Sequence, residues 1–240
     1  MPGFPTTRRS VLAAVRRGDD EARRTALETL LGAYWAPVYK YLRVAWRLDA
    51  EDAADLTQQL FTTALEDGTF AAYDPSKGRF RTYLRSCADH LAANERKAAR
   101  RLKRGGGART LPLELATAEG ELSRLEPRDP FDPDEYLHKE WVRSVFASAV
   151  AALEKALAAR GRAVVFEVFA RNDHADEGPE RPAYADISRE LGIPATQVTN
   201  HLAAARRELK RLVLDEIRRG TASEREYRAE VRHVLGVDAP

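Results

Sequence analysis

The stretch that decides the fold is residues 49–104, which read DAEDAADLTQQLFTTALEDGTFAAYDPSKGRFRTYLRSCADHLAANERKAARRLKR. Its first part predicts an amphipathic helix, because small and apolar side chains recur every three or four positions across residues 53–64. Asp49 suits the N-cap of that helix, where a short carboxylate accepts a hydrogen bond from a free backbone N–H group. An Asp-Gly pair at positions 67 and 68 ends the helix, and a loop with turn residues follows at 73–78.

A polar stripe lies on another face of this first predicted helix. Its side chains recur at three- and four-residue steps, so they share one side of the helix. They carry only carboxylate, amide and hydroxyl groups, with no lysine or arginine to neutralise them. By itself, such a stripe fits the start and the solvated face of a helix. The stripe consists of Asp52, Asp55, Gln59, Thr62 and Glu66.

Aromatic rings and cations alternate after the loop. Residues 79–85 read RFRTYLR, and seven cations without a carboxylate follow between Arg96 and Arg109. Cations beside exposed aromatic rings suit single-stranded nucleic acid, because charge holds phosphates and flat faces hold unstacked bases. The alternative interpretation is an arginine-rich solvated helix whose aromatic residues belong to the core.

Three segments in this order resemble region 2 of bacterial sigma factors, and more narrowly the extracytoplasmic-function (ECF) group of the sigma-70 family. They are 55–61 (DLTQQLF), 77–84 (KGRFRTYL) and 94–107, which begins with NER and ends with KRGGG. In that family the first helix docks on the coiled coil of the largest polymerase subunit, and the loop and second helix recognise and open the −10 element. The resemblance implies core-polymerase binding by Asp52, Asp55, Gln58, Gln59 and Thr62. It implies −10 DNA binding by Tyr73, Lys77, Arg79, Arg81, Tyr83, Asn94, Arg96, Lys97, Arg100 and Arg101.

Charge is unevenly distributed along the 240 residues, although the net charge is only +2. Residues 1–110 carry 20 cations and 13 carboxylates, residues 111–159 carry 5 and 10, and residues 160–240 carry 14 and 14. This distribution predicts segments with different tasks. The stretch 105–136 is rich in proline and acidic residues and lacks a periodic apolar face, so we interpret it as a flexible acidic linker.

A helix-turn-helix pattern follows in the second half of the chain. Residues 184–191 predict a short helix that ends at Gly192, and a second helix begins near Pro194. The same pattern also fits a pair of packed helices without a DNA role. The resemblance places it in region 4 of sigma factors, which reads the −35 element. There Gln and Asn suit base edges, whereas Arg and Lys suit phosphates. The residues implied for −35 DNA binding are Thr196, Gln197, Thr199, Asn200, Ala203, Arg206, Arg207 and Lys210.

These patterns together predict an all-α protein with two helical domains joined by a flexible acidic linker. The expected segments are residues 1–104 for the region 2 helix bundle, 105–136 for the linker, 137–219 for the region 4 helix-turn-helix and 220–240 for a C-terminal helical tail. The sequence assigns no role to a polar insertion at 171–182 or to the tail.

The expected function is promoter-specific initiation of transcription, with core RNA polymerase and promoter DNA as partners. An anti-sigma protein is a further candidate partner under the resemblance. The alternative is a stand-alone helix-turn-helix regulator, which would leave the polar stripe without a role. The sequence indicates neither the promoters nor the activating signal.

An enzyme is not expected, and no cofactor or metal is implied. The five histidines show no ligand spacing, and the single cysteine, Cys87, excludes an intramolecular disulfide and a cysteine-based zinc site. No stretch is apolar enough to span a membrane, and the first residues lack a signal-peptide core. We therefore expect a soluble, cytoplasmic protein without a membrane partner.

Overall fold

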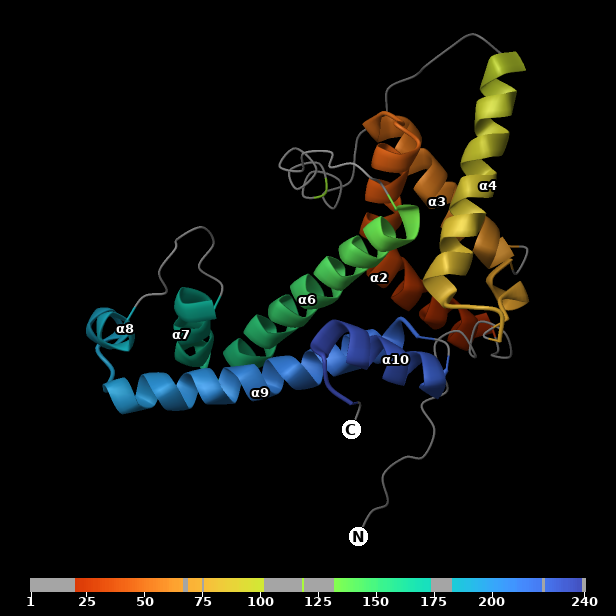
Figure 1. Ribbon diagram of the computed structural model, residues 1–240. Helices are drawn as coiled ribbons and strands as arrows, with labels where there is room; N and C mark the ends of the chain where they lie inside the picture. Colours follow the sequence, from red (N-terminus) through yellow and green to blue (C-terminus); the bar gives the residue numbers. More distant parts are fainter. Residues whose placement is uncertain are drawn as a thin grey trace. The chain divides into compact units, whose positions relative to one another are not determined.

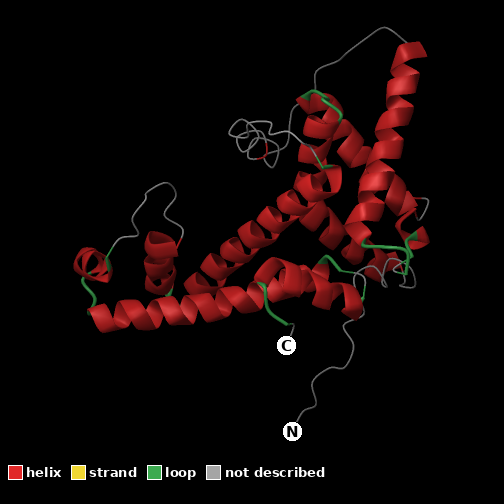
Figure 2. Cartoon of the chain, viewed as in Figure 1, coloured by secondary structure: helices red, strands yellow, loops and turns green. Residues whose placement is uncertain are grey.

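The computed structural model describes residues 20–66, 69–74, 76–101, 118, 132–173, 183–221 and 223–238. These residues form helices, turns and loops and no strand, which confirms the predicted all-α class (Figure 2). The helices are α2 (Asp20–Ala45), α3 (Ala50–Glu66), the 3-10 helix η1 (Thr69–Ala72), α4 (Phe80–Arg101), α6 (Pro133–Ala159), α7 (Ala163–Asp173), α8 (Tyr184–Leu191), α9 (Ala195–Arg219) and α10 (Glu224–Leu235) (Figure 1). Most of the predicted linker lies outside the described residues, as does most of the 171–182 insertion.

The chain divides into two compact units. Unit 1 comprises residues 1–144 and 217–240, and unit 2 comprises residues 145–216. Helices α6 and α9 therefore contribute residues to both units. These units do not follow the predicted segment boundaries, because the start of α6 and the C-terminal helix α10 group with α2, α3 and α4.

Helix α3 forms as its local sequence predicts. The Asp49 carboxylate accepts a hydrogen bond from the backbone N–H of Asp52 at 2.8 Å, which confirms the predicted N-cap. The helix lies beside α2 and α4 (Figure 1). Its predicted apolar face is buried and includes Leu56, Leu60 and Phe61. Burial of each large apolar side chain contributes about 1.5–3 kcal/mol to folding.

The aromatic stretch in α2 belongs to the core of unit 1. Tyr34, Val38, Tyr39 and Leu42 are buried. The helix is continuous through Pro37. A proline inside a helix removes one backbone hydrogen bond, and the burial of its aromatic and aliphatic neighbours offsets that cost.

Phe80, the first residue of α4, lies at the centre of a cluster of rings in unit 1. Its ring is fully buried and meets three others edge to face, with centroids 5.5 Å from Tyr34, 5.4 Å from Phe70 and 5.3 Å from Tyr73. Edge-to-face pairs of this kind contribute about 0.5–1.5 kcal/mol each beyond burial. The cluster therefore fixes the start of α4 to α2 and to the segment that follows α3.

The C-terminal helix α10 is part of unit 1. It begins at Ser223, whose side chain accepts a hydrogen bond from Glu226 N at 3.2 Å, and it buries Tyr227 and Val231. Just before the helix, the Gly220 carbonyl accepts a buried hydrogen bond of 2.9 Å from the Tyr34 hydroxyl. A Cβ atom at position 220 would lie only 3.2 Å from the Trp141 ring nitrogen, so any larger residue would require the Trp141 ring to shift by a few tenths of an ångström.

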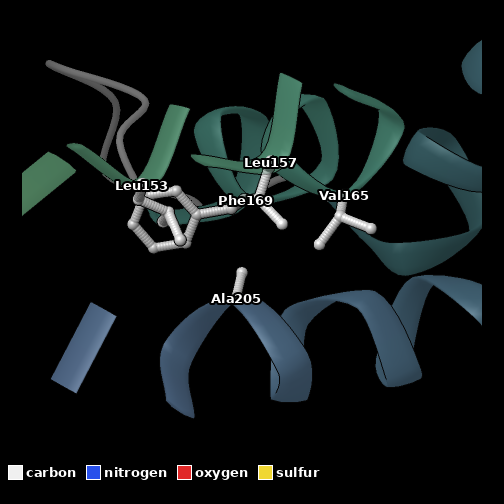
Figure 3. Close-up of a cluster of buried hydrophobic side chains, with 5 residues drawn as sticks. All are labelled: Leu153, Leu157, Val165, Phe169 and Ala205. Atoms are coloured by element: carbon white, nitrogen blue, oxygen red, sulfur yellow. The ribbon is translucent and has the colours of Figure 1, made fainter. Parts of the chain in front are cut away.

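Unit 2 has a core built from α6, α7, α8 and α9. Figure 3 shows Leu153 and Leu157 of α6 beside Val165 and Phe169 of α7, with Ala205 of α9 below them, and all five are buried. A second buried cluster joins α7 and α8 to the first half of α9 and consists of Val168, Ile187, Val198 and Leu202. These clusters hold the two helices of the predicted helix-turn-helix in place.

The stability of unit 1 should decrease below about pH 6.5 because of His138. Burial, then Arg81, His233, Arg79 and Lys139, lower the pKa of His138 from 6.5 to about 3. The unfolded chain then binds a proton that the folded chain excludes, so stability is complete above pH 6.5 and is lost progressively toward pH 3. Melting temperatures at pH 7 and pH 5 should differ less for His138→Gln than for the unaltered chain.

The matched control for this prediction is His90→Gln, because His90 is an exposed histidine on α4. That substitution should leave the pH dependence unchanged. If His138→Gln keeps the full difference between pH 7 and pH 5, His138 is not the group responsible.

Candidate functional site

Helix α3 presents four residues of the polar stripe to solvent, Asp52, Asp55, Gln59 and Thr62. All five residues that the resemblance assigns to core-polymerase binding are exposed. Partial burial, together with the nearby carboxylates of Asp49, Asp55 and Glu95, raises the pKa of Asp52 above its ordinary value. Glu95 belongs to α4, so the structure brings near Asp52 a carboxylate that the sequence pattern of α3 alone does not predict. The exposed residues are Asp52, Asp55, Gln58, Gln59 and Thr62.

This surface has unneutralised negative charge. Among the described residues, no lysine or arginine forms an ion pair with Asp52 or Asp55, and no group of three or more metal-ligating side chains is arranged to hold an ion. Carboxylates and amides on a rigid helix can accept several hydrogen bonds from a cationic partner. The stripe is therefore suited to docking of a basic protein surface.

The segment that precedes α4 differs from the prediction. Tyr73 was predicted to be a free ring for stacking on bases, but it is buried, with 3% of its surface exposed. Its ring packs on Phe80, and its hydroxyl donates a hydrogen bond to the Gly78 carbonyl at 2.7 Å. The half-buried Tyr83 donates to the Thr69 carbonyl at 2.8 Å. Base stacking requires an exposed ring face, and in this conformation the packing of Tyr73 and Tyr83 does not provide one.

Arg81 also differs from its predicted role as a phosphate ligand. Its side chain is only 7% exposed, and its guanidinium nitrogen lies 2.7 Å from a carboxylate oxygen of Glu230 on α10. Arg79 is 44% exposed and lies 3.4 Å from the same oxygen. The physical reason is that α10 brings a buried carboxylate to both arginines, so the ion pair satisfies Arg81 inside the protein.

The remaining residues of the predicted −10 surface fall into two groups. Lys77, Asn94, Arg96 and Lys97 are exposed, the last three along α4. The backbone of Arg100 and Arg101 belongs to the final turn of α4, and their side chains lie outside the described part of the structure. The exposed cations of α4 can hold phosphates. Of the two aromatic residues in the predicted surface, Tyr73 is buried and Tyr83 is half-buried.

In unit 2, α8 and α9 are joined by the short turn that the sequence predicts. Gly192 adopts φ 63°, in the left-handed region, and its N–H group donates to the Ser188 carbonyl. The Ser188 hydroxyl donates to the Ile193 carbonyl at 2.6 Å, which fixes the turn a second time. α9 then begins at Ala195, directly after Pro194.

The start of α9 presents the predicted −35 residues to solvent. All eight are exposed, while Val198, Leu202 and Ala205 on the opposite face are buried. This division leaves the amide side chains of Gln197 and Asn200 accessible to hydrogen-bond partners. The exposed residues are Thr196, Gln197, Thr199, Asn200, Ala203, Arg206, Arg207 and Lys210.

Arg206 is engaged within unit 2 and is not simply a phosphate anchor. Its guanidinium forms two hydrogen bonds with the Asp173 carboxylate, at 2.6 and 2.7 Å, and one of 3.0 Å with the Asn172 side chain. A bidentate pair of this kind is among the strongest polar contacts of arginine. Arg207 and Lys210 are therefore better candidates for phosphate binding.

Sequence reasoning missed two acidic residues of α10, Glu226 and Glu230, which are buried against the start of α4. A signal was available: they are four residues apart and directly precede Tyr227 and Val231, so they border the apolar face of the helix. It also missed the buried ion pair between Lys40 of α2 and Glu140 of α6, at 3.0 Å. No local pattern indicates that pair, because the two residues are far apart in the chain.

Comparisons of the chain with protein-family models, with curated proteins and with solved structures find no match. None of the described helices has the length and apolar character needed to cross a membrane. The interpretation of the surfaces on α3, α4 and α9 therefore rests on their own chemistry and on the resemblance in the sequence.

Proposed function

We propose that this chain is a sigma factor of the ECF type, a subunit that directs bacterial RNA polymerase to promoters. In this proposal the polar stripe of α3 binds core polymerase, the cations of α4 bind DNA at the −10 element, and the start of α9 reads the −35 element. The chain makes no bond itself, since the polymerase performs the chemistry.

The observation that carries the proposal is the exposed stripe on α3. The turn and the exposed amides at the start of α9 fit both a sigma factor and a stand-alone DNA-binding regulator. A regulator that binds only DNA has no use for unneutralised carboxylates, because they repel phosphates. A subunit that must dock on a basic protein surface needs them. The stripe therefore favours the first function over the second.

The decisive experiment is run-off transcription from genomic fragments with core polymerase, in the presence and absence of the protein. A sigma factor should give transcripts that start at defined sites only when both components are present. DNA binding without any core-dependent transcript would support the stand-alone regulator instead.

Substitutions at the start of α9 should separate base reading from phosphate binding. Gln197→Ala or Asn200→Ala should reduce discrimination at individual upstream base pairs by about 1–3 kcal/mol each, because a bidentate amide contact is lost. Arg207→Ala or Lys210→Ala should weaken binding to all sequences alike and lower the salt slope by about one unit per contact. Binding titrations on a set of point-altered duplexes at several salt concentrations would measure both effects.

Arg206→Ala serves as the internal comparison. Because Arg206 binds Asp173, its loss should reduce the stability of unit 2 more than it changes the salt slope. If all of these substitutions have the same effect on DNA binding, the division into base readers and phosphate anchors is wrong.

A further inference from the structure

Helix α10 places two carboxylates on the segment that the proposed function assigns to the opening of DNA. The Glu226 carboxylate accepts a hydrogen bond of 2.9 Å from the backbone N–H of Phe80, the first residue of α4. The Glu230 carboxylate lies 2.7 Å from Arg81 and 3.4 Å from Arg79. Both carboxylates are buried, and both act on groups far away in the sequence.

These contacts have the chemistry of phosphate binding. A guanidinium pairs with a carboxylate or a phosphate in the same way, through its positive charge and the N–H groups that it can donate. At Glu230 the contacts are ion pairs, since neither of its buried oxygens accepts a hydrogen bond from a described residue. The N-terminus of a helix likewise attracts either anion through its free N–H groups. Glu226 and Glu230 therefore contact the same kinds of group that bind phosphate oxygens in proteins.

The buried surface of α10 is unusual for a purely structural helix. Four of its side chains are buried, and two of them are the carboxylates Glu226 and Glu230, beside Tyr227 and Val231. A helix that only completes a core buries apolar groups, because burial of charge requires compensation. The attachment of α10 therefore includes two buried carboxylates beside Tyr227 and Val231, and a polyanion can compete with those carboxylates.

We propose that α10 is an intramolecular cover that competes with nucleic-acid phosphates for Arg79, Arg81 and the N-terminus of α4. This inference rests on the proposed function and deepens it. With α10 docked, Arg81 is enclosed and the segment binds DNA weakly. When DNA displaces α10, the two arginines and the α4 N-terminus become available together.

The first test compares Glu230→Gln with Glu224→Gln in the full chain. The substitution at Glu230 removes the competing charge at nearly constant volume, whereas Glu224 lies on the exposed side of the same helix and pairs with Arg218 and Arg228, both of them exposed. The affinity for a short oligo-dT strand should increase about tenfold for Glu230→Gln. It should change by less than about twofold for Glu224→Gln. Unchanged or weaker binding by Glu230→Gln would show that α10 is a fixed part of the DNA-binding unit.

The second test uses the unaltered chain, so it does not depend on the folding of a variant. Hydrogen exchange is measured on α10 and α4 with and without saturating oligo-dT. Displacement predicts that the amides of α10 exchange faster in the presence of the strand, while those of α4 do not. If the amides of α10 exchange at the same rate or more slowly when oligo-dT is bound, DNA does not displace α10 and the proposal is wrong.

Run-off transcription separates this inference from the proposed function. Core-dependent transcripts with no gain in oligo-dT affinity for Glu230→Gln would leave the sigma-factor function intact and refute the cover. A gain in affinity and faster exchange of α10, without any core-dependent transcript, would support the cover and refute the sigma-factor function.

Discussion

Asp55→Arg should weaken the binding of core RNA polymerase about ten- to a hundredfold. Asp55 is an exposed residue of the polar stripe on α3, where the resemblance places the polymerase contact. Hydrogen bonds to a charged group contribute about 1.5–3 kcal/mol, and a cation in the same place adds repulsion from a basic partner. Gln59→Arg should act in the same direction. The dissociation constant is measured by titration of labelled core polymerase.

The matched control is Glu28→Arg on α2, which also replaces an exposed carboxylate with arginine but lies outside the stripe. Its existing pair with Arg24 is exposed on both sides, so its loss costs little. All three tryptophans, Trp35, Trp46 and Trp141, belong to unit 1, so their fluorescence shows whether that unit remains folded. Equal polymerase affinity for Asp55→Arg and Glu28→Arg would contradict the assignment of the stripe.

Glu140→Leu should destabilise unit 1 by about 3–5 kcal/mol. The Glu140 side chain is 1% exposed and the Lys40 side chain is 5% exposed, and their charged atoms are 3.0 Å apart. Removal of one partner of a buried ion pair leaves the other charge in a medium that solvates it poorly. Urea unfolding followed by tryptophan fluorescence measures the change in free energy of unfolding for unit 1 alone.

The double variant Lys40→Met/Glu140→Leu distinguishes this explanation from simple loss of packing. Because replacement of both charges also removes the buried ammonium that has lost Glu140, most of the lost stability should return. The exposed residue Glu28 again provides a comparison, since Glu28→Leu should change stability by less than about 0.5 kcal/mol. A double variant no more stable than Glu140→Leu would show that the ion pair is not the cause.

Features that depend on neighbours three or four positions away could be predicted from the sequence. The Asp49 cap, the buried face of α3 and the turn at Gly192 are of this kind, because helical periodicity and local hydrogen bonds determine them. The exposure of the −35 residues follows from the same periodicity once Val198 and Leu202 are buried.

The burial and pairing of the polar and aromatic residues around the start of α4 could not be predicted in the same way. Tyr73 and Arg81 have a composition that suits nucleic acid, but Glu230 of α10 lies far along the chain and determines whether the arginine is free. Arg206 is a comparable case, since its partner Asp173 is 33 positions away. A charged side chain binds whichever opposite charge the fold brings near it, and periodicity carries no information on that partner.

The division of the chain into a discontinuous and a continuous unit has a consequence for its synthesis. Unit 2, residues 145–216, consists of one uninterrupted stretch, so all of its contacts become available as soon as that stretch has left the ribosome. Unit 1 is built from residues that precede unit 2 in the sequence and residues that follow it. The hydrogen bond between Tyr34 and Gly220 can therefore form only after residue 220 has been synthesised. Contacts between distant positions form slowly because a long loop must first close. During translation we therefore expect unit 2 to fold before unit 1 is complete. Until α10 has been synthesised, part of the aromatic core of α2, α3 and α4 should stay exposed, and chaperones can bind it.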